Sequence, residues 1–144
     1  MIIPIIRFNF LKSITLEERG QLRRFLISLF KKEGKRVTEL QYIFCSDSYL
    51  LDINRRYLGH DFYTDIVTFD LSEKDQSINA EIYISVDRVR ENARKYDSSL
   101  KKELHRVIFH GALHLCGYKD KTVQQTRIMR NMEEKYLELY GCST

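Results

Sequence analysis

The fold of this chain is decided by the stretch His110-Gly111-Ala112-Leu113-His114-Leu115-Cys116-Gly117-Tyr118-Lys119-Asp120. Residues four apart share one face of a helix, with Cβ atoms about 6 Å apart, so His110 and His114 can direct both imidazoles at one ion. Gly117 follows His114 by three residues, where a left-handed glycine would end the helix and reverse the chain. This reversal predicts that Asp120 returns towards the two histidines.

The pattern predicts a single-metal hydrolase site at the end of a long helix, with His110, His114 and Asp120 as the protein ligands. One zinc ion suits these donors, and other divalent cations are alternatives. Three protein ligands leave a fourth position for water, which is typical of a catalytic zinc site. No catalytic group is assigned beyond the metal-bound water. Zinc proteases carry a glutamate directly after the first histidine as general base, and here that position is Gly111.

Size and composition favour one globular domain spanning residues 1–144, with 43% apolar and 31% charged residues. The three cysteines, Cys45, Cys116 and Cys142, are widely separated and lack paired Cys-x-x-Cys spacing, which predicts a reducing cytoplasm. The apolar start, Met1 to Phe10, is too short to span a bilayer, so we expect a strand and no membrane partner. A net charge of +4 favours a polyanionic partner.

Hydrophobic periodicity and capping signals predict nine elements. Strands are expected at 1–10, 37–45, 65–71 and 81–86. Helices are expected from a capping box at Thr15 to Glu18 up to Gly34, from Ser46 or Asp47 to Gly59, over 87–96 and 100–116, and from a second capping box at Thr122 to Gln125 up to Gly141. The resulting fold class is α+β, a single domain with a mixed sheet of about four strands covered by helices.

Three polar residues near these motifs are given ordinary roles. His105 lies nine positions before His114, on the opposite helical face, which favours a surface or capping role over ligation. His60 and Asp61 follow the glycine that ends a helix, where solvated loop residues are the usual occupants.

Beyond the first motif, two segments carry a family resemblance. They are Tyr57-Leu58-Gly59-His60-Asp61 with Thr64-Asp65-Ile66-Val67-Thr68-Phe69, and the strand Glu81-Ile82-Tyr83-Ile84-Ser85. Together with His110 to Tyr118, they make the chain from about residue 40 onward resemble the YbeY family of bacterial rRNA-maturation endoribonucleases. The hallmark of that family is His-Gly-x-x-His-Leu-x-Gly-Tyr-x-His.

The resemblance implies an α+β fold, a zinc ion and a single-strand-specific, metal-dependent endoribonuclease. It also implies a role in 3′-end maturation of 16S rRNA and in ribosome quality control. The implied partners are rRNA, the small ribosomal subunit and ribosome-associated proteins, with no DNA. Two positions depart from the family pattern: Asp120 stands where the third ligand is commonly histidine, and Leu58 stands where an arginine implicated in activity is common.

RNA beside the metal would need cations to neutralise its phosphates. The candidate substrate-binding residues are Arg55, Arg56, Arg88, Lys119 and Lys121. Two other functions stay open on the sequence alone. One is a metal-dependent hydrolase of another class, such as a peptidase, and the other is a ribosome-associated binding protein with a non-catalytic metal.

Overall fold

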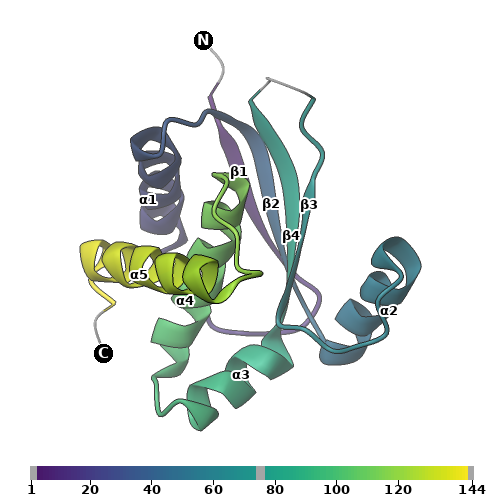
Figure 1. Cartoon of the computed structure of the whole chain (residues 1–144). Helices are drawn as coiled ribbons and strands as arrows, with labels where there is room; N and C mark the ends of the chain where they lie inside the picture. The colour runs from purple at the N-terminus through teal and green to yellow at the C-terminus, as the bar shows by residue number, and fades with distance from the viewer. Residues whose placement is uncertain (1–2, 74–76, 143–144) are drawn as a thin grey trace.

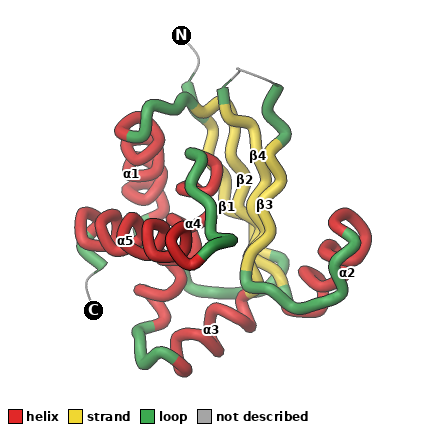
Figure 2. The backbone as a smooth tube through the Cα atoms, viewed as in Figure 1, coloured by secondary structure: helices red, strands yellow, loops and turns green. Residues whose placement is uncertain are grey.

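The computed structural model describes residues 3–73 and 77–142. Its elements follow the order β1(Ile5–Phe10), α1(Arg19–Lys32), β2(Val37–Cys45), α2(Asp47–Leu58), β3(Ile66–Asp70), β4(Ile78–Ser85), α3(Val86–Lys95), α4(Leu100–Leu115) and α5(Val123–Tyr140). Figures 1 and 2 show one sheet, with α1, α4 and α5 gathered on the same side of it. The predicted α+β class with a four-stranded mixed sheet is confirmed.

The sheet has the strand order β1-β2-β4-β3. β2 pairs in parallel with both β1 and β4, whereas β3 pairs with β4 in the antiparallel direction. β3 and β4 follow each other in the chain and pair directly, and residues 74–76 between them lie outside the described residues. β3 is therefore an edge strand, and its start lies beside the candidate site.

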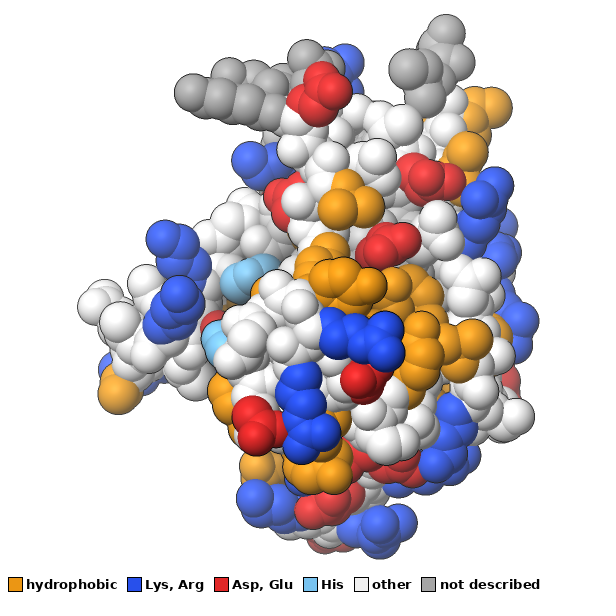
Figure 3. Space-filling view, turned by 90° about the vertical axis from the view of Figure 1, so that its right-hand side faces the viewer, with side chains coloured by type: hydrophobic (Ala, Val, Ile, Leu, Met, Phe, Trp, Pro, Cys, Tyr) orange, Lys and Arg blue, Asp and Glu red, His pale blue; other side chains and the backbone are white. Residues whose placement is uncertain are grey.

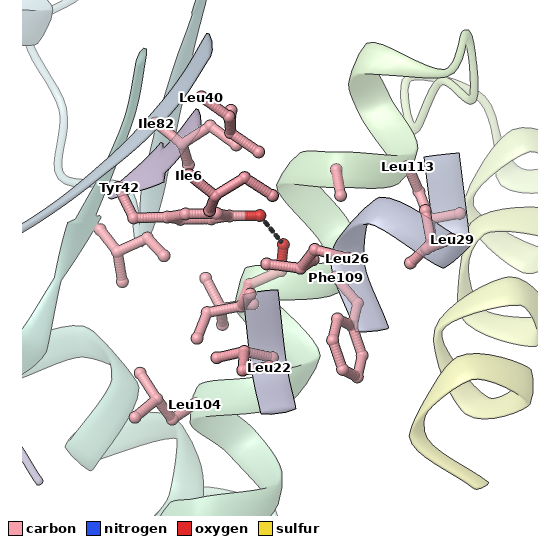
Figure 4. Close-up of a cluster of buried hydrophobic side chains, with 14 of the residues drawn as sticks. Ile6, Leu22, Leu26, Leu29, Leu40, Tyr42, Ile82, Leu104, Phe109 and Leu113 are labelled. Carbon is pink, nitrogen blue, oxygen red and sulfur yellow. Dashed lines mark hydrogen bonds between the residues drawn. The ribbon is translucent and has the colours of Figure 1, made fainter. Parts of the chain in front are cut away.

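The main core fills the space between the sheet and the helices α1 and α4 (Figure 4). Alternate residues of each strand point towards these helices, because successive strand side chains face opposite sides. Tyr42 is fully buried and its hydroxyl donates a 2.9 Å hydrogen bond to the Ile108 carbonyl of α4, which satisfies a polar atom inside the core. A smaller cluster of Cys45, Leu50, Ile53 and Val67 packs α2 against the sheet.

Gly111 lets α4 lie directly on β3 and β4. A Cβ atom at this position would fall 2.9 Å from Ile82 Cδ1 and 3.0 Å from Ile66 Cδ1, closer than carbon atoms tolerate. The glycine is buried on the sheet-facing side of α4, so any larger side chain there would enter the core. The contact fixes where the neighbouring His110 emerges.

We expect Gly111→Val to lower the free energy of unfolding by about 1–3 kcal/mol, because the added methyl groups overpack the contact with Ile82. The matched control is Gly20→Val in α1, where a Cβ would meet only the Arg24 guanidinium at 3.6 Å. Valine is no worse than glycine in a helix, so the control should change stability by less than about 0.5 kcal/mol. Urea denaturation measures both, and equal losses would contradict the packing role of Gly111.

Helix boundaries test the capping predictions. Ser46 caps α2, and the second capping box, Thr122 with Gln125, is present in full at the start of α5. Gly59 and Gly141 end α2 and α5 in the left-handed conformation. Each of these predictions is confirmed.

The prediction of a capping box at Thr15 to Glu18 is wrong. α1 begins at Arg19, its N-cap residue Glu18 is itself left-handed, and no side chain caps the helix. The reason is that Ile14 and Leu16 are buried in the main core, 7% and 5% exposed, which keeps residues 13–18 outside the helix. Tertiary burial here outweighs a local capping preference.

The cysteines are all free thiols, and burial raises the pKa of both Cys45 and Cys116 to about 12. In the part of the chain that the structure describes, no helix is both long enough and apolar enough to cross a membrane.

Candidate active site

A pocket of about 500 Å³ opens between α4, α5 and the start of β3. It contains all three predicted metal ligands, His110, His114 and Asp120. α4 supplies the two histidines, one helical turn apart, and the connection to α5 supplies the aspartate. Gly117, with φ of 107°, ends α4 and turns the chain back, as predicted. Figure 3 shows histidine side chains on the surface between a lobe bearing lysine and arginine and a central hydrophobic area.

His110 is held by carboxylates at both ring nitrogens. Its Nδ1 lies 2.7 Å from Glu133 Oε2 on α5, and its Nε2 lies 3.3 Å from Asp120 Oδ2. A carboxylate can only accept here, so Nδ1 carries a hydrogen in this contact. A histidine whose Nδ1–H is bound in this way presents Nε2 to a metal, with fixed tautomer and ring orientation.

His114 has the same arrangement with a backbone acceptor. Its Nδ1 donates to the Tyr118 carbonyl at 3.1 Å, and the neutral ring in this tautomer has its lone pair on Nε2. The turn at Gly117 brings this carbonyl within reach, so the same reversal that returns Asp120 also orients His114.

The donor set fits zinc in its chemistry and in the distance between two of its donor atoms. Two ligands of a tetrahedral zinc ion with bonds of about 2.0–2.1 Å lie about 3.3 Å apart, which matches the separation of His110 Nε2 and Asp120 Oδ2. Across residues 3–73 and 77–142, however, no three His, Cys, Asp and Glu side chains are already grouped to hold a metal ion. The Asp120 side chain is 44% exposed and can rotate, whereas both imidazoles are held at Nδ1. The ligand assignment stays a prediction.

Three carboxylates that line the pocket act on His110. Burial alone disfavours the imidazolium, but the hydrogen bond and charge of Glu133, together with Asp65 and Asp120, outweigh burial and raise the pKa of His110. Burial also disfavours the charged form of Asp65 and raises its pKa, although the charge of His110 opposes this rise. The negative field in the pocket therefore favours a cation beside these groups.

Arg106 balances part of this negative charge beneath the site. Its guanidinium lies 3.4 Å from Glu103, 3.3 Å from Glu133 and 2.7 Å from Glu134. The side chains of Glu103 and Glu133 are 6% and 4% exposed. Arg106 thus holds in place the carboxylate that orients His110.

Glu33, the residue that ends α1, ties α1 to α5 and to the connection between α4 and α5. Its carboxylate accepts hydrogen bonds from the Tyr118 hydroxyl, at 2.8 Å, and from the Tyr136 hydroxyl on α5. Because the Tyr118 carbonyl in turn accepts from His114, Glu33 supports the turn that orients this histidine. The hydrogen bond to Glu33 is the main reason that the pKa of Tyr118 rises to about 12.

Glu33→Ala should lower the free energy of unfolding by about 2 kcal/mol, since the hydroxyls of the partly buried Tyr118 and the fully buried Tyr136 both lose their acceptor. The pKa of Tyr118 should fall from about 12 towards the ordinary tyrosine value. Urea denaturation and an NMR titration of ¹³C-labelled tyrosine measure the two effects. Glu17→Ala, at an exposed position, is the control. An unchanged Tyr118 titration in Glu33→Ala would rule out the hydrogen bond between the Tyr118 hydroxyl and Glu33.

The five predicted phosphate-binding cations divide into two groups. The three arginines are paired: Arg55 with Asp61, Arg56 with Asp52 at 3.1 Å, and Arg88 with Asp47 at 3.1 Å. Lys119 and Lys121 flank Asp120, are exposed, and have no carboxylate partner within the described ranges. The lysines are thus the cations available beside the pocket, while RNA contact by any of the five stays a prediction.

Comparison with known proteins identifies the family. The model of the family "Endoribonuclease YbeY" matches residues 10–141. The chain belongs to the YbeY endoribonuclease family. It is 52% identical to the Endoribonuclease YbeY of Cytophaga hutchinsonii over 124 residues, which cover 86% of this chain and 87% of that protein. It is 43% identical to the Flavobacterium psychrophilum protein of the same name over 136 residues, 94% and 96% of the two chains.

A solved structure has the same fold. The solution structure of TM1509 from Thermotoga maritima aligns with a TM-score of 0.61 and 29% identity, covering 94% of this chain and 91% of that one. The YbeY resemblance predicted from the sequence motifs is therefore confirmed.

The geometry at Gly111 bears on the peptidase alternative. A zinc protease needs a glutamate at this position facing the metal. Here Gly111 does not line the pocket, and a Cβ at this position would fall against Ile82 and Ile66, so the α4 of this YbeY fold has no room for that base.

Sequence reasoning missed several residues of the site and misplaced one. Glu133 is buried in the helical row of Met129, Tyr136 and Leu137, and a carboxylate within such an apolar row was the available signal. His60, predicted as a solvated loop residue, is exposed but lines the pocket. His105 was predicted to have a surface or capping role; it is not at the surface, being 2% exposed, and its ring stacks on Tyr140 because α5 covers that side of α4.

Proposed function

We propose that this protein is a metal-dependent endoribonuclease that cleaves single-stranded RNA, and that it acts in 16S rRNA 3′-end maturation and ribosome quality control in the cytoplasm. The observation that carries the proposal is the meeting of His110, His114 and Asp120 in one pocket of a YbeY-family chain. Its partners would be rRNA, the small ribosomal subunit and ribosome-associated proteins.

In this proposal, His110 and His114 bind one zinc ion through Nε2 and Asp120 binds it through its carboxylate. When bound, the metal supplies a Lewis acid and lowers the pKa of a coordinated water. Glu133 and the Tyr118 carbonyl hold the Nδ1 hydrogens and thereby fix both imidazoles. Lys119 and Lys121 neutralise phosphates beside the pocket, which keeps an RNA strand close to the reacting groups.

The test uses purified protein with a labelled single-stranded RNA, the same RNA as a duplex, and an unstructured peptide, each with and without chelator. We expect cleavage of the single strand alone, loss of cleavage with chelator, and recovery when zinc is added back. Small ribosomal subunits that retain unprocessed 16S 3′ ends should be matured. Peptide cleavage would instead identify a peptidase, and subunit binding without cleavage under any divalent metal would identify a binding protein.

A further inference from the structure

The connection between α2 and β3 presents two stacked rings to the pocket. His60 and Phe62 both line it, with ring centroids 5.0 Å apart and ring planes 19° from parallel. Phe62 is 56% exposed, a large apolar area to leave in water on a wall of the candidate active site. An exposed flat ring at such a place can pack against a flat ligand.

Several contacts hold this connection in its conformation. Asn54, only 1% exposed, donates from its side-chain Nδ2 to the Phe62 carbonyl at 3.0 Å. The backbone carbonyl of Asn54 accepts from the backbone amide of His60 at 3.1 Å. Arg88, paired with Asp47, places its guanidinium 5.0 Å from the centre of the Tyr63 ring. A ring held in advance loses little conformational entropy when a ligand packs on it.

The connection between α4 and α5 supplies cations at the edge of the pocket. Asp120 lines the pocket from this connection, and its neighbours Lys119 and Lys121 are exposed and have no carboxylate partner among the described residues, while the rings belong to the connection after α2. A strand that enters the pocket past the α4–α5 connection would thus meet both cations and an aromatic face. Single-stranded nucleic acids are bound by this combination, in which cations hold the phosphates and aromatic rings stack on the bases.

We propose that Phe62, backed by His60, is a stacking site for one unpaired nucleobase of the RNA that enters the pocket. This inference rests on the proposed endoribonuclease function and adds to it a residue that selects unpaired over paired RNA. A base within a duplex has both faces covered by its neighbours, so only an unstacked base can lie on Phe62.

Phe62→Leu tests the site by removing the ring while keeping an apolar side chain. We expect about tenfold weaker binding of a single-stranded RNA decamer in EDTA, which corresponds to about 1.4 kcal/mol and lies within the usual range for one stacked base. In the cleavage assay the loss should fall mainly on KM. The matched control is Tyr49→Leu, which removes an exposed aromatic ring of α2 that lies outside the pocket and should leave binding unchanged.

Phe62→Trp gives a direct readout, because the chain contains no tryptophan. Its fluorescence should be quenched by the RNA decamer, much less by the same RNA as a duplex, and not by an abasic decamer. Equal quenching by the abasic strand, or unchanged RNA binding by Phe62→Leu in a protein that cleaves RNA, would overturn the stacking site alone. A wild-type protein that neither binds nor cleaves RNA would overturn both the site and the proposed function, and tighter binding of an apolar peptide would assign the rings to a protein partner.

Discussion

Asp120→Asn is expected to weaken zinc binding by more than about 100-fold, whereas Asp120→His should keep it. The carboxylate is the one anionic ligand of the proposed set, and the neutral amide is a poor replacement. Loss of groups that merely orient metal ligands already costs about 10–100-fold in affinity, so loss of a ligand should cost more. Histidine restores a zinc donor at the position where the family commonly carries one.

Metal content of the purified variants and competition with a chromophoric chelator measure this effect without any activity assay. The control is Asp97→Asn, because Asp97 is exposed and has φ of 51°, a conformation that asparagine also tolerates. Wild-type, Asp120→His and Asp97→Asn proteins should retain the metal. Equal metal content in wild type and Asp120→Asn would exclude Asp120 as a ligand.

Local signals in the sequence sufficed for much of the fold. β2 was predicted with its observed bounds, Val37–Cys45, from alternation of apolar and polar residues. The left-handed turn at Gly117 was also predicted, because only glycine adopts that conformation without strain. These features depend on neighbours within a few residues, so the sequence shows them directly.

The remaining features depend on contacts between distant segments. Glu133 lies 23 residues from His110 and reaches it only because α5 packs across α4. Asn54 holds the Phe62 carbonyl because residues 60–62 fold back over the end of α2. No spacing rule within one helix or loop predicts such pairs, which is why the groups supporting the site were found only in the structure.

Arg106→Ala should be the most destabilising single change beneath the site, lowering the free energy of unfolding by about 3–5 kcal/mol at neutral pH. The Arg106 side chain is 14% exposed, and its guanidinium pairs with the buried carboxylates of Glu103 and Glu133. Without it, both carboxylates stay buried with a weaker cation, since Arg130 lies 3.8 Å from Glu133 and is 56% exposed. Removing one partner of a buried ion pair leaves an uncompensated charge, and this accounts for the size of the loss.

The loss should shrink as the pH falls. Burial raises the pKa of Glu103 in the native protein and Arg106 opposes that rise, so the pKa should climb further in the variant. A carboxyl whose pKa is higher when folded binds more protons in the native state, so its destabilising effect grows as pH rises from the unfolded value through the folded one. Urea denaturation of Arg106→Ala should therefore show a clearly smaller deficit at pH 5 than at pH 7.5. Arg94→Ala, at an exposed position of α3, should change stability by less than about 0.5 kcal/mol at either pH. A deficit for Arg106→Ala that is the same at both pH values would show that lost packing, rather than buried charge, causes it.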